Sequence, residues 1–232
     1  NVCGELDTVS LASFCSGTNG FVAKWYDQAS TNDATQSTTA NQPKIYDSVT
    51  GVVTENGKPA CDFSGSYYLD AGDVADSTGD ICCYSIINHN NSAGNPFGAV
   101  ISKSKAAAGA NRWSVGPYRS VYVDSSNSNN TADFALTANQ QILASFEFLG
   151  SDSMKAYEDG VQDATTATLT GNISDNANHL LVGAYGDSSG TGGVYQYFAG
   201  TSIQEIILYT TSDQSANRTN IESNINTFYS IY

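Results

Sequence analysis

The amino-acid sequence predicts an all-β sandwich that carries one α-helix at its C-terminal end. Short runs rich in β-branched and aromatic residues are separated by clusters of Gly, Asn, Asp and Ser, a pattern typical of a sandwich and not of alternating βαβ units. Hydrophobic residues make up 40% of the 232 residues, which is enough to build a core, so we do not expect intrinsic disorder. No linker, internal repeat or charge block divides the chain, and we expect a single domain over residues 1–232.

A clear strand signal lies at residues 141–149, where one face of the strand is apolar and the other mixes Leu143 and Leu149 with Ser145 and Glu147. Ile142, Ala144 and Phe146 share one face with Phe148, because successive side chains of a strand point to opposite sides. Asp159-Gly160 predicts a two-residue hairpin turn, since both central positions of such a turn favour a positive φ. The other strands are predicted at residues 20–26, 60–63, 67–71, 80–88, 97–103, 112–115, 120–123, 133–136, 154–158, 179–185, 195–199 and 202–209.

The C-terminal segment, residues 212–232, departs from the β pattern and predicts the helix. Ser212 or Asp213 is the expected N-cap, because their side-chain oxygens accept hydrogen bonds from the first backbone amides of a helix. Apolar residues recur at helical spacing, so one face of the helix should lie against the sandwich while its polar face is solvated. These apolar residues are Ile221, Ile225, Phe228, Tyr229 and Tyr232.

The charge balance excludes several classes of partner. The chain has 23 acidic and 9 basic residues, a net charge of −14, and therefore lacks the clustered Lys and Arg that nucleic-acid binding requires. No apolar run approaches the roughly 18 residues of a membrane-spanning helix, so we expect no membrane insertion. Only 14% of the residues are charged, and the surface should consist largely of hydroxyl and amide groups.

The five cysteines have no CxxC pair and no metal-type spacing. Two interpretations stay open. A Cys3–Cys15 bridge would close a short N-terminal loop and imply an oxidising compartment. Alternatively, all five are reduced and partly buried thiols.

Five segments of the N-terminal third carry the similarity of this chain to a known family. They read Gly20-Phe-Val-Ala-Lys-Trp-Tyr-Asp-Gln28, Asn32-Asp-Ala-Thr-Gln36, Asn41-Gln-Pro-Lys-Ile45, Asn56-Gly-Lys-Pro-Ala60 and Phe63-Ser-Gly-Ser-Tyr-Tyr-Leu69. The series resembles a family of concanavalin A-like (laminin-G-like) domains found in bacteriophage and marine bacterial surface proteins. The resemblance implies a jelly-roll sandwich of two antiparallel sheets, and it implies that residues 1–19 are the remnant of a longer N-terminal part. It does not fix an activity, because such folds serve many functions.

The chain is also distantly similar to the catalytic domains of arabinofuranosidase B. Retaining glycosidases need two carboxylates about 5 Å apart, one as nucleophile and one as general acid/base. The similarity places the acid/base on Asp187, in Gly183-Ala-Tyr-Gly-Asp187, but Ser126 stands where the nucleophile is expected. Asp124 is a nearby carboxylate and a weak substitute. We therefore expect a broken catalytic pair and a domain that is not an enzyme.

The same region supplies the predicted ligand-binding residues. Tryptophan and tyrosine rings offer flat faces to sugar rings, and polar side chains at strand ends hydrogen-bond sugar hydroxyls. Each residue also has a structural interpretation, the rings as core and the Gly-rich segment 186–193 as a polar turn. The predicted residues are Trp113, Asp124, Asn127, Tyr185, Gly186 and Asp187.

No cofactor is expected, with calcium as the alternative. Asp70 and Asp73, with Asp76 and Asp80, form a spaced acidic stretch of the kind that can bind Ca²⁺, but the spacing matches no defined calcium loop. A solvated connection is the favoured interpretation.

Cys82-Cys83 resembles the adjacent pair of arabinofuranosidase B domains. Residues 79–87, however, have the pattern of a regular strand, which would direct the two side chains to opposite faces. We therefore favour two separate thiols over a vicinal disulfide.

The leading functional hypothesis is a non-catalytic carbohydrate-binding or structural surface module, as a phage virion fibre or decoration domain or a cell-surface adhesion domain. The alternatives are a retaining glycosidase that uses Asp187 and a purely structural virion assembly protein. The expected partners are a neutral glycan and other virion or surface-protein chains, including further copies of this one. The expected location is extracellular or on the virion surface.

Overall fold

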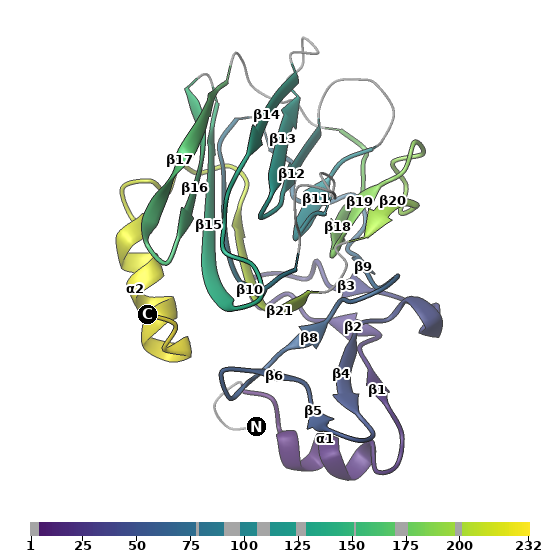
Figure 1. Ribbon diagram of the computed structural model, residues 1–232. Coiled ribbons are helices and arrows are strands. Elements are labelled where there is room, and N and C mark those ends of the chain that lie inside the picture. The colour runs from purple at the N-terminus through teal and green to yellow at the C-terminus, as the bar shows by residue number, and fades with distance from the viewer. Residues whose placement is uncertain are drawn as a thin grey trace.

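Two antiparallel β-sheets face each other, one helix covers an outer face, and a short helix lies at the N-terminal end (Figure 1). The computed structural model describes residues 5–77, 79–90, 98–105, 112–123, 129–150, 152–169, 176–197 and 201–232. The predicted all-β jelly-roll sandwich with a C-terminal helix is confirmed. Within the described ranges, neither helix has the length and apolar sequence needed to cross a bilayer.

The first sheet is built around its longest strands, β10 and β15. These two strands pair without interruption from Ile81 opposite Phe148 to Asn88 opposite Gln141. In order, the sheet contains β1 (Gly20–Phe21), β4 (Lys44–Asp47), β8 (Cys61–Asp62), β21 (Ser202–Tyr209), β10 (Ile81–Asn88), β15 (Gln141–Leu149), β16 (Ser153–Glu158) and β17 (Val161–Thr168), and β5 (Gly51–Val52) pairs with β4.

The second sheet covers the inner face of the first. In order, it contains β14 (Asn129–Asp133), β13 (Arg119–Val123), β12 (Arg112–Val115), β11 (Ile101–Lys103), β18 (Leu180–Val182), β9 (Leu69–Asp70), β3 (Ala34–Thr35) and β2 (Lys24–Trp25). The hairpins β6 (Thr54–Glu55) with β7 (Lys58–Pro59) and β19 (Ala184–Gly186) with β20 (Val194–Tyr197) form small separate sheets. A 3-10 turn, η1, spans Thr39–Asn41.

The main core fills the space between the sheets, and β15 contributes to it as predicted. Ile142, Ala144, Phe146 and Phe148 all belong to this cluster, together with the fully buried ring of Trp113. The predicted hairpin is also confirmed, since Glu158 pairs with Val161 across the turn and both turn residues have positive φ. Local side-chain alternation and turn chemistry therefore determine this part of the sheet.

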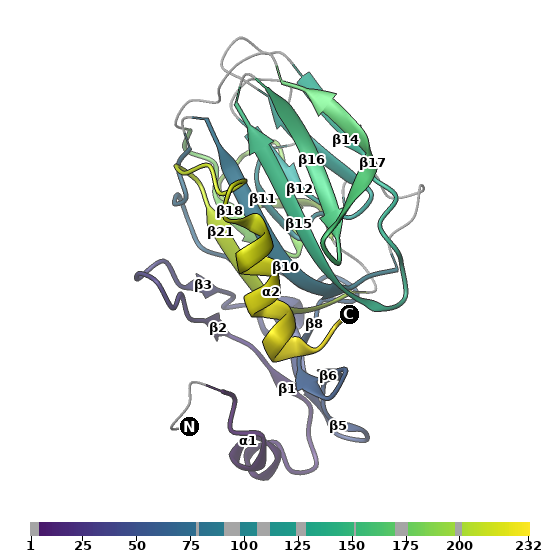
Figure 2. The same cartoon turned by 90° about the vertical axis from the view of Figure 1, so that its left-hand side faces the viewer.

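A second apolar cluster lies on the outer face of the first sheet, beneath α2 (Arg218–Tyr229) (Figure 2). Cys82, Tyr84 and Leu143 of the sheet pack there against Ile225 and Tyr229 of the helix. The prediction that the helix lies against the sandwich is confirmed. The outer face of β15 is therefore covered as well, which explains why Leu143 is fully buried on that face.

The cysteines behave as separate thiols. Cys82 points into the cluster beneath α2 and Cys83 into the main core, as the strand pattern predicted. Cys15, Cys61, Cys82 and Cys83 are free and buried. Cys3, the other half of the expected Cys3–Cys15 bridge, lies outside the described residues.

The helix is shorter than the predicted range 212–232, because the expected caps are used differently. The Asp213 carboxylate accepts a hydrogen bond from the Ser215 amide, which closes a turn before the helix begins. At the other end, Ser230 takes a left-handed conformation and its amide donates to the Asn226 carbonyl. Residues 212–217 are therefore a connection, and they lead into the helix from β21.

Three other predictions need correction. The predicted strand 20–26 is split, because β1 belongs to the first sheet and β2 to the second. The predicted strand 179–185 is interrupted at Gly183, whose φ is 76° and where a Cβ atom would meet the Phe63 ring at 2.3 Å. Strand β14 precedes the predicted 133–136 and includes only its first residue.

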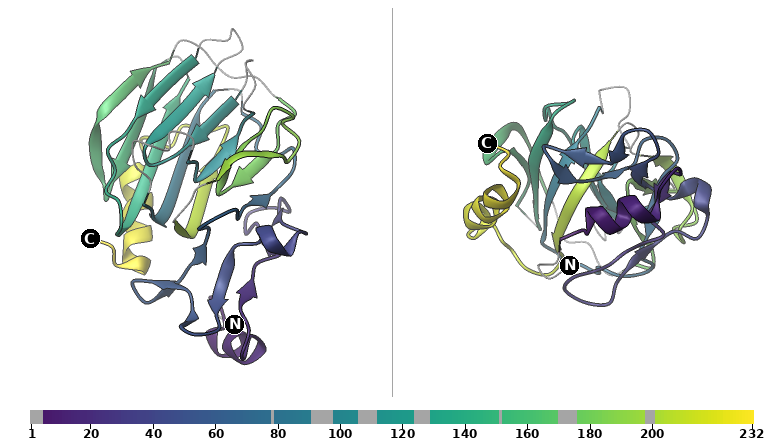
Figure 3. Two further views of the ribbon diagram at one scale, coloured as in Figure 1. Left: turned by 45° about the vertical axis from the view of Figure 1, so that its right-hand side comes forward. Right: turned by 90° about the horizontal axis from the view of Figure 1, so that it is seen from below.

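The N-terminal segment 1–19 contains a helix, α1 (Thr8–Phe14), that the sequence analysis did not predict. Asp7 caps it by accepting a hydrogen bond from the Ser10 amide. None of its residues is buried, so this helix contributes no side chain to the core. Figure 3 shows α1 at the end of the molecule formed by β1, β4 and β5.

Candidate functional site

Asp187, the predicted acid/base, lies in the turn between β19 and β20. Its carboxylate accepts hydrogen bonds from the amide and the hydroxyl of Ser189, and its own amide donates to the Gly193 carbonyl at 2.9 Å. The bonds from Ser189 lower the pKa of Asp187 below its usual value. A general acid needs a raised pKa, whereas the hydrogen bonds of this turn lower the pKa of Asp187.

The rings predicted to face a ligand are buried. Trp113 has no exposed surface and belongs to the main core, so its ring is not available to a sugar. Tyr185 is 2% exposed, and burial raises its pKa. Gly186 is required by close packing, because a Cβ atom there would meet the Ser104 carbonyl oxygen at 2.1 Å. Asp124 and Asn127 lie outside the described residues.

The carboxylates of the acidic stretch, considered above as calcium ligands, contact other groups of the protein instead. The buried Lys103 ammonium lies 2.7 Å from Asp73 and 2.9 Å from Asp76. Asp70 pairs with His179 at 2.9 Å, and Asp80 accepts a hydrogen bond from the Gly150 amide. Among the described residues there is no group of three or more His, Cys, Asp or Glu side chains placed to hold a metal ion.

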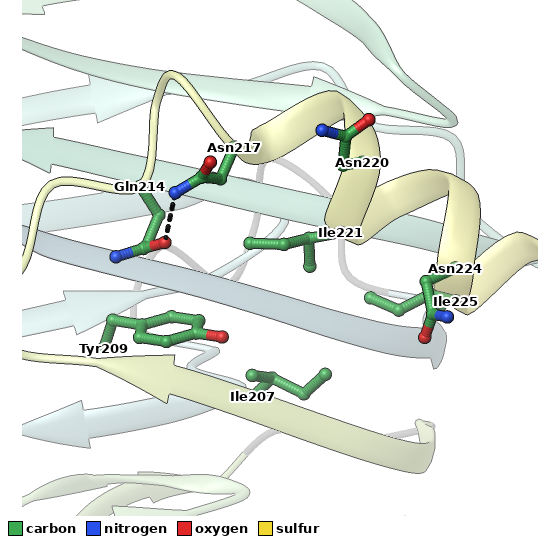
Figure 4. A pocket seen from close by; sticks show the side chains of 8 residues that line it. All are labelled: Ile207, Tyr209, Gln214, Asn217, Asn220, Ile221, Asn224 and Ile225. Carbon is green, nitrogen blue, oxygen red and sulfur yellow. Dashed lines mark hydrogen bonds between the residues drawn. The ribbon is translucent and has the colours of Figure 1, made fainter.

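A hollow elsewhere on the molecule is lined by neutral polar and apolar side chains. A pocket of about 430 Å³ lies between β21 on one side and α2, with the segment that leads into it, on the other (Figure 4). We call it the amide pocket. It is lined by Ile207, Tyr209, Gln214, Asn217, Asn220, Ile221, Asn224 and Ile225. None of these side chains is charged.

Two of the carboxamides are held in place by hydrogen bonds. The Gln214 side-chain NH₂ group donates to the Ser212 hydroxyl at 2.6 Å, and the Gln214 side-chain oxygen accepts from the side-chain NH₂ group of Asn217 at 3.1 Å. The Gln214 backbone amide donates to the Cys82 sulfur at 3.4 Å, which ties this wall to the sheet. The pair is therefore oriented before any ligand arrives, which reduces the entropy cost of binding.

The other two carboxamides are open to solvent. Asn220 and Asn224 are exposed on α2, and their side chains form no hydrogen bond within the described part of the chain. Asn217, Asn220 and Asn224 follow i, i+3, i+7 spacing, which places them along one edge of the helix over about 10 Å. In Figure 4, the Asn224 side chain points toward β21, whereas the Asn220 side chain lies farther from the strand.

Isoleucine side chains and one tyrosine form the apolar part of the pocket. Ile225 is 5% exposed, while Ile207, Tyr209 and Ile221 are half-buried. The Tyr209 ring packs edge-on against Tyr84, with centroids 6.3 Å apart, and this contact fixes its position on β21. The pocket thus combines fixed apolar surface with neutral hydrogen-bonding groups.

A buried polar cluster anchors the helix beside the pocket. The Glu222 carboxylate accepts hydrogen bonds from Arg218 and from the Ser145 hydroxyl, the latter at 2.8 Å. The Tyr157 hydroxyl donates to Glu147 at 3.0 Å, and the Arg218 guanidinium stacks on the Tyr157 ring at 3.8 Å. Burial raises the pKa of Glu147. These contacts hold the helical wall of the pocket in one position on the sheet.

The sequence pattern does not reveal the amide pocket. The polar face of the C-terminal helix is solvated as expected, and the spacing of Asn217, Asn220 and Asn224 is visible in the sequence. The spacing indicates a pocket only once β21 is known to lie opposite the helix, because residues of both elements line the pocket.

The fold is shared with solved structures, although no protein-family model matches the chain and no curated protein is similar to it in sequence. The binding domain of Paraclostridial Mosquitocidal Protein 1 aligns with a TM-score of 0.53 at 9% identity, over 90% of this chain and 52% of that one. The botulinum neurotoxin serotype G binding domain aligns with a TM-score of 0.52 at 10% identity, over 89% of this chain and 51% of that one. Domains LG4-5 of the mouse laminin α1 chain align with a TM-score of 0.48 at 13% identity, over 71% and 47% of the two chains. The chain spans about half the length of these solved structures, and at such identities the likeness is one of fold.

Proposed function

We propose that this chain is a non-catalytic module that binds neutral carbohydrate in the amide pocket. The observation that carries the proposal is the composition of the pocket. Four carboxamides, one tyrosine and three isoleucines line it, and no charged side chain does, in a chain whose net charge is −14.

This composition suits sugars for a chemical reason. A carboxamide offers both donors and an acceptor, so it can pair with hydroxyl groups in either role. The apolar side chains complement the C–H faces of sugar rings, and the Tyr209 ring is held in place to do so. An anionic ligand would find no cation among the lining residues and would be repelled by the overall charge.

The place of action we propose is the outside of a bacterial cell or a phage particle. The family resemblance of the sequence supports this, since it is to phage and marine bacterial surface proteins. Two of the solved structures of the same fold are named as binding domains, one of a mosquitocidal protein and one of a neurotoxin. Other surface-protein or virion chains, including copies of this one, are the further partners we propose.

A hydrolytic role has less support. The hydrogen bonds of the Asp187 carboxylate come from its own turn and keep it ionised. We expect no turnover of a chromogenic arabinofuranoside. Turnover that disappears in Asp187→Asn would replace the binding proposal with a glycosidase.

Calorimetric titration with a panel of neutral oligosaccharides tests the proposal. Asn220→Ala/Asn224→Ala removes two free carboxamides, and each lost hydrogen bond is worth about 1 kcal/mol, so we expect at least tenfold weaker binding. Ser223→Ala is the matched control, because Ser223 is exposed on the same helix but does not line the pocket. Binding that survives in the double variant would place the site elsewhere.

A further inference from the structure

We infer that the amide pocket selects sugars that carry an N-acetyl group; the inference rests on the proposed function and names the ligand class of the same site. The first argument is the position of the carboxamides. Gln214 and Asn217 stand at one end of the pocket and Asn224 at the other, with Ile221 between them (Figure 4).

A secondary amide fits this arrangement. Its N–H and C=O groups point in opposite directions, because the amide bond is planar and trans. An acetamido group between the two ends therefore meets a carboxamide on each side. Asn224 is free to turn its side chain to the required role, whereas the Gln214–Asn217 pair is already oriented at 3.1 Å.

The isoleucines supply the second argument. The acetyl methyl group needs apolar surface, and Ile221 and Ile207 provide it at the centre of the pocket. A plain hydroxyl group in the same place pairs with a carboxamide at one end only and leaves the isoleucine side chains uncovered. The pocket therefore discriminates between an acetamido group and a hydroxyl group at the same ring position.

The charges near the pocket supply the third argument, because they disfavour acidic N-acetylated sugars. Arg218 is the cation adjacent to the lining residues, and it is already paired with Glu222 and stacked on Tyr157. Its side chain is only 19% exposed. The ligand class is thus neutral N-acetylhexosamine residues, alone or within a chain.

The test compares two disaccharides that share their linkage and differ at C2. N,N′-diacetylchitobiose carries acetamido groups, whereas cellobiose carries hydroxyl groups. Calorimetry or ligand-observed NMR on the full chain should give about tenfold tighter binding of diacetylchitobiose, the effect expected of one additional hydrogen bond to a carboxamide. The preference should disappear in Asn224→Ala and persist in Ser223→Ala, and circular dichroism of both variants checks that they fold.

Each outcome separates this inference from the proposed function. Equal binding of the two disaccharides, or tighter binding of cellobiose, overturns the N-acetyl selectivity and leaves neutral-sugar binding in place. A preference that survives in Asn224→Ala also overturns the inference, because the selecting group is then elsewhere. If no neutral sugar of any class binds, the proposed function itself fails.

Discussion

Replacement of Ile225 by alanine tests how firmly α2 is docked, and therefore whether the amide pocket is a fixed feature. Ile225 is 5% exposed and packs with Tyr84, Leu143 and Tyr229 beneath the helix. The change removes three carbon atoms, which corresponds to about 2.4 kcal/mol of transfer free energy at roughly 0.8 kcal/mol each. The cavity left behind adds to this, so we expect the free energy of unfolding to fall by about 3 kcal/mol.

Urea unfolding measures this loss, with the fluorescence of the buried Trp113 and the circular dichroism of the backbone as probes. Asn224→Ala is the matched control one position away. It is exposed, and alanine favours helix, so stability should be unchanged or higher by about 0.5 kcal/mol. A loss below about 1 kcal/mol in Ile225→Ala would refute the reasoning, because a docked helix cannot lose this side chain at so small a cost.

Three further predictions concern buried polar groups. Burial raises the pKa of Glu147, so the folded state retains this proton more strongly than the unfolded chain, and the stabilisation is lost as pH rises through the folded pKa. Urea unfolding at several pH values should therefore show wild type losing stability relative to Glu147→Gln as the pH rises above 4.5, the ordinary pKa of the group; a constant difference would contradict this. Lys103→Met removes a buried ammonium but leaves the Asp73 carboxylate half-exposed to water. We therefore expect the free energy of unfolding to fall by about 1–2 kcal/mol and proteolysis near residue 73 to become faster. Unchanged stability and unchanged proteolysis would show that the ion pair is unimportant. Burial raises the pKa of Cys61 and of Cys82 to about 12, so iodoacetamide at pH 8 should modify neither in the folded protein and both in urea, as mass spectrometry will reveal.

The parts of the fold that follow from local patterns were predictable from the sequence. The alternation in β15 and the Asp159-Gly160 turn each depend on neighbouring residues, and the structure confirms both. The boundaries that failed depend on distant partners. Strand β18 ends at Gly183 because Phe63 occupies the space that a side chain would need.

The candidate site was not predictable in the same way. From the sequence, the Trp113 ring has two interpretations, a platform for a sugar or a part of the core, and the structure places it in the core. The amide pocket joins residues 207–209 of a strand to residues 214–225 of the following helix. Its character arises from the docking of α2 onto the sheet, and the apolar spacing of Ile221 and Ile225 predicted that docking without locating the pocket.

The side-chain amide signals of a ¹⁵N-labelled sample give the most direct test of the central claim, that the amide pocket binds neutral carbohydrate. Titration with diacetylchitobiose and with other neutral oligosaccharides should shift the NH₂ resonances of Asn220, Asn224 and Gln214 together, along one saturation curve. The backbone amides around Asp187 should stay in place. Shifts confined to the Asp187 turn, or none with any neutral sugar, would contradict the account.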